Sequence, residues 1–258
     1  MAETILLVFE GSKREPQILD SFRKNYLHGE SRTLFHVCYE AEVYQLWQSL
    51  KDDPDVSLIR ELQFREQKLG KPSGIPYEKV TDIFLFFDYD GQSSLASDRD
   101  MADMLRYFQD SNTMTGNGLL YLSYPMVEAI RHLAPGIDFS QVVVNAKITG
   151  AEYKKLSACS DYQHLKKLEK ADWDFINAEH YKKAHFIVCG SWALPANQAT
   201  LATLNQSGIF AAQLKKYIQS RQEIAVLSAF PFFIVEYFGE KVFAELQQSL
   251  HPSEHSEP

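Results

Sequence analysis

The first half of the chain alternates between two kinds of hydrophobic pattern. Continuous apolar runs of a few residues are typical of buried parallel strands, and apolar positions three or four residues apart are typical of amphipathic helices. The first pattern predicts strands at residues 4–10, 33–38, 82–88 and 118–125. The second predicts helices at residues 15–27, 40–51, 56–69, 97–109 and 125–133. This alternation predicts an α/β fold, in which helices cover both faces of a parallel sheet.

The second half, from about residue 150, has a mainly helical pattern. Helical spacing of Lys, Glu, Tyr and Leu runs through residues 150–183, and a further strand is predicted for HFIVCGS at residues 185–191. Residues 197–248 are predicted to be almost wholly helical. This segment includes an apolar core helix that breaks at Pro231, because proline cannot donate a helical hydrogen bond.

The change of pattern divides the chain into parts. We expect an α/β domain over residues 1–149, a mainly helical region over residues 150–250 and a disordered polar tail over residues 251–258. With 258 residues, 45% of them hydrophobic, the chain is long enough to bury a large core without disulfides or metal ions.

The composition argues against several classes of protein. The three cysteines share no CxxC spacing, so we expect neither a disulfide framework nor a zinc site, and we expect a reducing, cytoplasmic location. No apolar run reaches the roughly 18 to 20 residues that a membrane-spanning helix needs. We therefore expect no membrane association.

The net charge of −8 argues against a protein that coats nucleic acid, because phosphate binding depends on clustered Lys and Arg. The second half nevertheless contains clusters of lysine: Lys154 and Lys155, Lys166, Lys167 and Lys170, Lys182 and Lys183, Lys215 and Lys216. These clusters are either solvated helix faces or a basic surface that brings a polyanion to an acidic site.

Carboxylates follow two of the predicted strands directly. Glu10 ends the first strand before Gly11, and Asp88 and Asp90 end the strand of the DYDG segment. The carboxyl ends of parallel strands meet at one edge of a sheet, and oxygen ligands there suit a hard cation such as Mg²⁺. Glu128, just after the next strand, either enters the same edge or is an ordinary helix residue.

Three short motifs resemble those of the TOPRIM domain, which occurs in topoisomerases, primases and the OLD-type and RloB-type nucleases. RloB-like proteins typically show EGxxTE, then DxD, then NPxFE, where this chain has EGSKRE, DYD and YPMVE. The match covers Glu10, Gly11, Glu15, Asp88, Asp90, Pro125 and Glu128. The chain departs from the pattern at Arg14, where Thr is usual, and at Tyr124, where Asn is usual.

The resemblance implies a parallel TOPRIM (Rossmann-like) sheet and magnesium-dependent phosphodiester cleavage of DNA, RNA or tRNA. Asp88 and Asp90 would hold one or two Mg²⁺ or Mn²⁺ ions, and Glu10 would complete the metal shell or act as the general base. Glu128 would be a further ligand or an orienting group. Lys13 or Lys147 would neutralise the phosphate, although each is also a candidate surface lysine.

The helical second half is similar to the C-terminal part of small bacterial anti-phage defence effectors that work beside an ATPase. This resemblance implies a toxic effector with an ABC-type or OLD-type ATPase partner from the same operon. The chain itself has no P-loop, because GKPSG at residues 70–74 lacks the GxxxxGK[ST] spacing. The sequence leaves open whether the chain forms a homo-oligomer.

Two other functions stay open. A haloacid-dehalogenase-like phosphatase would use Asp88 as nucleophile, Asp90 as general acid, and Ser123 and Lys147 to bind phosphate. This alternative leaves Glu10 without a role, and Gln92 stands where that family usually has Thr. The other alternative is a non-catalytic subunit that binds nucleic acid or an ATPase through a TOPRIM-like sheet.

Overall fold

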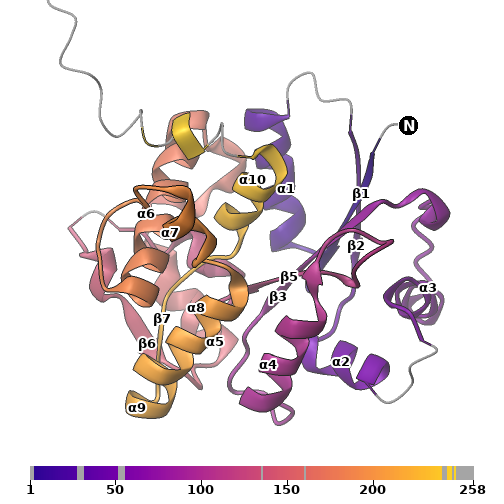
Figure 1. The fold of residues 1–258 in the computed structure, drawn as a ribbon, viewed down its shortest axis with the longest axis horizontal. Helices are drawn as coiled ribbons and strands as arrows, with labels where there is room; N and C mark the ends of the chain where they lie inside the picture. The colour runs from indigo at the N-terminus through magenta and orange to yellow at the C-terminus, as the bar shows by residue number, and fades with distance from the viewer. Residues whose placement is uncertain are drawn as a thin grey trace, which may run out of the picture.

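A five-stranded sheet forms the centre of the molecule (Figure 1). The computed structural model describes residues 3–27, 32–51, 56–134, 136–159, 161–239, 243–245 and 247, so the predicted tail at 251–258 lies outside the described residues. In spatial order the strands are β2 (Thr33–Cys38), β1 (Thr4–Phe9), β3 (Asp82–Asp88), β5 (Gly118–Ser123) and β4 (Gln109–Asp110). The first four pair in parallel, and the short β4 is antiparallel to β5.

The helices of the first half form where the sequence predicts them, with ends shifted by a few residues. They are α1 (Arg14–Tyr26), α2 (Val43–Lys51), α3 (Leu58–Leu69) and α4 (Asp98–Tyr107), with a 3₁₀ turn η1 (Tyr77–Lys79) before β3. Local capping sets these ends. Ser57 and Ser97 accept backbone N–H groups at the starts of α3 and α4, and Gly70 ends α3 with a positive φ of 64°.

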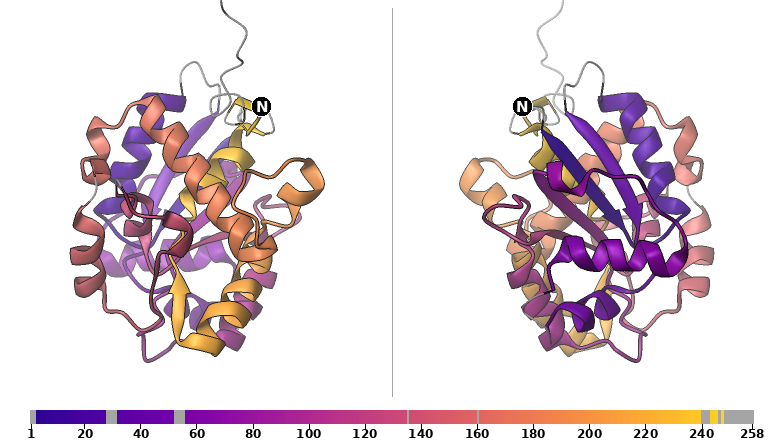
Figure 2. Two further views of the ribbon diagram at one scale, coloured as in Figure 1. Left: turned by 90° about the vertical axis from the view of Figure 1, so that its left-hand side faces the viewer. Right: turned by 90° about the vertical axis from the view of Figure 1, so that its right-hand side faces the viewer.

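Helices cover both faces of the sheet, as Figure 2 shows from the two sides. Successive side chains of a strand point to opposite faces. On one face Phe86 stacks on Phe230 of α10 (Phe230–Phe238), with ring centroids 4.6 Å apart. On the other face Phe87 meets Tyr39 at 6.0 Å, and the Tyr39 hydroxyl donates to Glu61 of α3. The predicted α/β architecture, a mostly parallel sheet between helices, is therefore confirmed.

The second half is mainly helical and packs on the face of the sheet that carries Phe86. Its helices are α5 (Gly150–Leu156), α6 (Lys170–Cys189), α7 (Gln198–Ala202), α8 (Gln206–Gln213), α9 (Gln219–Arg221) and α10. Short turns link them: η3 (Phe139–Gln141), η4 (Ser157–Cys159), η5 (Asp161–Gln163), η6 (Leu165–Lys167) and a π turn, η7 (Leu214–Ile218). No helix in the described part of the chain is long and apolar enough to cross a membrane.

The strand predicted at residues 185–191 is wrong, because this segment forms the last turn and the end of α6. A short apolar run fits a buried helix as well as it fits a strand. The helix stops at Gly190, whose φ of 78° is accessible to glycine at low cost.

The prediction that residues 197–248 are almost wholly helical is also wrong in part. The segment contains β7 (Glu223–Ala225), which pairs antiparallel with β6 (Val143–Asn145). This pairing joins residues about 80 positions apart, so local helical spacing gives no sign of it. Gln222, with φ of 55°, ends α9 before the strand. Pro231 lies at the start of α10, where a missing N–H costs nothing, and does not break a longer helix.

The segment after β5 differs from its prediction too. A helix is predicted from Pro125 onward, but the Tyr124–Pro125 bond is cis and the helical turn is a 3₁₀ helix, η2 (Val127–Arg131). Tyr124 exchanges both backbone hydrogen bonds with Leu227, at 2.8 and 2.9 Å. The segment that carries Glu128 is therefore held between the sheet and the second half of the chain.

Candidate functional site

Glu10 and Asp88 lie side by side at the carboxyl edge of the sheet. Because β1 and β3 are neighbours with Phe9 opposite Phe86, both strands end at the same level. The Glu10 N–H donates to the Phe86 carbonyl at 3.0 Å, which continues the pairing past the end of β1. The Asp88 N–H in turn donates to Glu10 Oε2 at 2.9 Å. The predicted meeting of these two acidic strand ends is therefore present in the structure.

Glu128 enters the same edge through the segment that follows β5. The Val127 N–H donates to Asp88 Oδ1 at 2.7 Å and fixes the start of η2 against the end of β3. Glu128, the next residue, is buried, and its charge contributes to the raised pKa of Asp88. Of the two alternatives for Glu128, the structure therefore shows the first.

The DYDG turn places Asp90 beside Glu10. Asp90 has a positive φ of 43° and is buried, and its Oδ1 accepts from Gln92 Nε2 at 2.9 Å. The turn is pressed against the β6 segment at Gly91. A Cβ atom on Gly91 would lie 2.3 Å from the Ala146 carbonyl oxygen, so only glycine fits here without movement of the backbone.

Two further carboxylates belong to this edge. Glu15, in the first turn of α1, is buried and accepts the Gly11 N–H at 3.0 Å. Glu42 follows β2, accepts from Ser93 Oγ at 2.6 Å and contributes to the raised pKa of Asp90. Glu15 is part of the EGSKRE motif, whereas Glu42 was missed. Its signal was its position after a strand parallel to β1, because every such strand ends at this edge.

Burial and mutual repulsion raise the pKa values of Glu10, Glu15, Asp88 and Asp90. The pKa of Asp88 is well above its ordinary range, first because the carboxyl is desolvated and then because Glu10, Asp90, Glu15 and Glu128 are close. Desolvation and then Asp90 raise the pKa of Glu10, against the lowering effect of the Asp88 N–H. The surroundings of these carboxyls therefore disfavour their ionised forms, and a bound cation would favour them.

Two cations approach the edge, and neither is Lys13 or Lys147, the lysines predicted to neutralise the phosphate; one of them, Lys154, belongs to a predicted lysine cluster. Arg14 Nε lies 3.8 Å and Lys154 Nζ 3.9 Å from Glu128 Oε1. Lys154 also lowers the pKa values of Glu15 and Asp90. Lys13 is exposed, and Lys147 is an exposed residue that lines a separate cavity with Glu152. Within the described residues, Lys147 forms no ion pair with the acidic edge.

The acidic edge has the ligand types that suit Mg²⁺, but their side-chain oxygens do not point to one common position. Among the residues that the structure describes, no group of three or more His, Cys, Asp or Glu side chains is arranged to hold a metal ion. Glu10 and Asp88 each direct one oxygen to a backbone N–H, so a shared ion would require their side chains to turn. The buried Glu128 Oε2 has no hydrogen-bond partner among the described residues, and an acceptor in this state fits a cation.

The arrangement can do three things chemically. It can gather oxygen ligands around a hard cation, hold a carboxyl of raised pKa ready to accept a proton, and present Arg14 and Lys154 to an anion. Comparison of the chain with protein-family models, with curated proteins and with solved structures finds no match.

Proposed function

We propose that this chain is a magnesium-dependent nuclease with a TOPRIM-like site. The observation that carries the proposal is the contact between Glu10 and Asp88 at the ends of neighbouring parallel strands, with Asp90 and Glu128 close enough to raise the pKa of Asp88. Buried like charges are costly without a balancing cation. The order of these acids along the chain is the order of the motifs EGSKRE, DYD and YPMVE.

In this proposal Asp88, Asp90 and Glu10 hold the ion, and Glu128 is a further ligand or an orienting group. Bound Mg²⁺ or Mn²⁺ would supply positive charge to the scissile phosphate and its leaving oxygen. Glu10, with its raised pKa, is suited to take the proton of the attacking water when it is not a ligand. Arg14 and Lys154 replace Lys147 as the cations that attract the phosphodiester.

The biological setting that we propose rests on the sequence resemblance alone. The substrate would be DNA, RNA or tRNA in the cytoplasm, and the chain would act as a toxic effector in anti-phage defence. Its activity would be controlled by an ABC-type or OLD-type ATPase from the same operon.

The phosphatase alternative gains no support from the geometry. Ser123, its phosphate-binding hydroxyl, is buried and accepts the Ala229 N–H at 3.3 Å. The exposed Lys147 forms no ion pair with Asp88 in the described part of the chain. One observation supports the non-catalytic subunit. Arg14 and Lys154 lie close to Glu128 and offset part of its charge, so the edge depends less on a bound metal ion.

A cleavage assay separates these functions. The purified chain, alone and with the product of the neighbouring ATPase gene, is incubated with single-stranded DNA, duplex DNA, RNA and tRNA in Mg²⁺, in Mn²⁺ and in EDTA. We expect metal-dependent cleavage that Glu10→Gln and Asp88→Asn each reduce by roughly 100-fold or more. Asp103→Asn is the matched control, because Asp103 of α4 pairs with Arg106 and, within the described residues, forms no ion pair with the acidic edge.

The proposal fails if no substrate is cut under any of these conditions, or if Glu10→Gln and Asp88→Asn cut as fast as the control. A fluoride-trapped phosphoaspartate on Asp88 would establish the phosphatase instead. Metal-independent binding of nucleic acid without cleavage would establish the non-catalytic subunit.

A further inference from the structure

A cavity of about 450 Å³ lies beside β5, away from the acidic edge. Its walls come from β5, α6, α8 and α10, and include Leu119, Tyr121, Tyr181, Gln206, Phe232 and Glu236. Leu119 precedes Ser123 by four residues, so this wall lies about 13 Å along the strand from the carboxyl edge. The volume is in the range of small-molecule sites.

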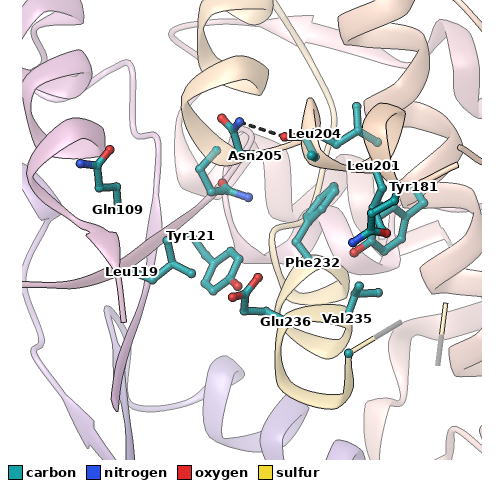
Figure 3. A pocket seen from close by; sticks show the side chains of 14 residues that line it. Gln109, Leu119, Tyr121, Tyr181, Leu201, Leu204, Asn205, Phe232, Val235 and Glu236 are labelled. Carbon is teal, nitrogen blue, oxygen red and sulfur yellow. Dashed lines mark hydrogen bonds between the residues drawn. The ribbon is translucent and has the colours of Figure 1, made fainter. Parts of the chain in front are cut away.

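Three polar side chains that line this cavity form no hydrogen bond with any residue that the structure describes. Figure 3 shows Tyr121 of β5 and Glu236 of α10 turned toward each other beside Phe232. Tyr121 and Tyr181 are 3% and 2% exposed, yet neither hydroxyl forms a hydrogen bond with a described residue. Glu236 is exposed over part of its surface, and partial desolvation raises the pKa of its carboxyl. Its charge in turn raises the pKa values of Tyr121 and Tyr181. Both hydroxyls are therefore free to form hydrogen bonds with a ligand in the cavity.

The remaining polar groups define which ligand would fit. Carboxamides of Gln109 and Gln198 also line the cavity and offer both donors and acceptors. The Asn205 carboxamide lines it too, but it already accepts the Gly208 N–H and donates to the Ala202 carbonyl. Gln206 Oε1 accepts the Leu122 N–H at 3.1 Å, so its NH₂ group is left to face the cavity. No Lys, Arg or His is among the described lining residues. A site with a carboxylate and no cation disfavours phosphate and other anions.

We propose that this cavity binds a nucleobase or nucleoside without a phosphate group. A flat heterocycle stacks on aromatic walls such as Tyr121 and Phe232, and its N–H edge donates to the Glu236 carboxylate. Its ring nitrogens and carbonyl oxygens accept from the tyrosine hydroxyls and the carboxamides. An ammonium ion is a less suitable ligand, because it would pair with the Glu236 carboxylate but could not accept hydrogen bonds from the tyrosine hydroxyls and the carboxamide NH₂ groups. The proposal does not depend on nuclease activity.

Thermal unfolding and calorimetry with defined probes test the proposal. Guanosine, adenosine and cytidine are each titrated into the intact chain, beside their 5′-monophosphates and spermidine. At saturation we expect at least one nucleoside to raise the melting temperature by roughly 5 °C. Its monophosphate should bind more weakly. We expect Glu236→Gln and Tyr121→Phe each to weaken the nucleoside roughly ten-fold.

Two substitutions outside the cavity serve as matched controls. Glu78→Gln changes an exposed carboxylate in η1, and Tyr217→Phe removes a hydroxyl in η7, so both should leave binding unchanged. The proposal is overturned if no nucleoside binds, if the cavity variants bind as tightly as the controls, or if a monophosphate or spermidine binds more tightly than every nucleoside. A cavity variant that does not fold would show no unfolding transition. In that case the other of the two cavity variants, Glu236→Gln or Tyr121→Phe, decides the outcome.

Discussion

At the scale of the single residue, Asp88 has the most crowded environment in the acidic edge. Four other carboxylates contribute to its raised pKa after burial itself. A carboxyl whose pKa is raised by folding binds its proton more tightly in the folded protein than in the unfolded chain. The free energy of unfolding therefore falls as the pH rises from the ordinary pKa of Asp toward the raised one.

Asp88→Asn should reduce this pH dependence, to which Glu10, Glu15 and Asp90 also contribute. The amide oxygen can still accept the Val127 N–H, while the charge that repels Glu10 is gone. In EDTA we expect the variant and the wild type to be about equally stable near pH 4, and the variant to be more stable near pH 8 by about 1 kcal/mol or more. Chemical unfolding across the pH range measures the difference.

Near pH 8, Mg²⁺ should make the wild type more stable than Asp88→Asn. A cation offsets the repulsion in the wild type but finds one ligand fewer in the variant, so only the wild type should gain substantial stability. The expectation is contradicted if the free energies of unfolding of the wild type and Asp88→Asn differ by the same amount at every pH, with and without Mg²⁺. Asp88 would then not be repelled by the neighbouring carboxylates.

Sequence reasoning at this scale found the acids that directly end strands and missed residues brought in by packing. Glu10, Asp88 and Asp90 follow apolar runs, which mark them. Glu42 was missed because it lies in the loop after β2 and not at the strand end itself. Lys154 reaches the edge from α5, and it belongs to a lysine cluster for which a basic surface beside an acidic site was one alternative. Lys183 shows the reverse error. It is fully buried and donates to the carbonyls of Phe139, Ser140 and Val142. Both alternatives for its lysine cluster, a solvated helix face and a basic surface, require an exposed side chain.

At the scale of the element, the DYDG turn depends on how closely β3 and β6 approach. Gly91 touches the Ala146 carbonyl, so the turn that carries Asp90 is fixed by a segment more than fifty residues later. The four parallel strands and most helices were predictable because their spacing is local, whereas the short strands β4 and β6 were not predicted. Strand β7 was not predictable in this way, because its pairing with β6 is a tertiary contact that overrides local propensity.

Gly91→Ala should destabilise the protein by about 1–3 kcal/mol, because the added methyl group would overlap backbone atoms. We also expect weaker stabilisation by Mg²⁺, since the displaced turn carries Asp90. Gly150→Ala is the matched control. Its methyl group would lie 3.5 Å from Met126 Cε at the start of α5, so stability should stay equal or rise by up to about 1 kcal/mol. Equal stability of the two variants, measured by chemical unfolding, would contradict the close approach.

At the scale of the whole molecule, the sheet and the second half share one hydrophobic core. Phe233 of α10 is fully buried and lies 5.8 Å from Phe22 of α1 and 5.0 Å from Phe84 of β3, between ring centroids. The backbone pairing of Tyr124 with Leu227 adds a second link. Both the acidic edge and the cavity beside β5 use residues from the two halves, through Lys154 and Glu236.

A shared core predicts that the two halves unfold together. Phe233→Ala should lower the free energy of unfolding by about 3–5 kcal/mol, because it leaves a cavity between α10, α1 and the sheet. Phe64→Ala, at a side chain of α3 that is 59% exposed, should change it by less than about 1 kcal/mol. Hydrogen exchange follows the amides of β3 and α6 separately, and Phe233→Ala should weaken the protection of both by the same factor. Loss of protection in α6 alone would show that the second half unfolds independently of the sheet. Unfolding of the second half would then remove Lys154 from the acidic edge while the sheet stays folded.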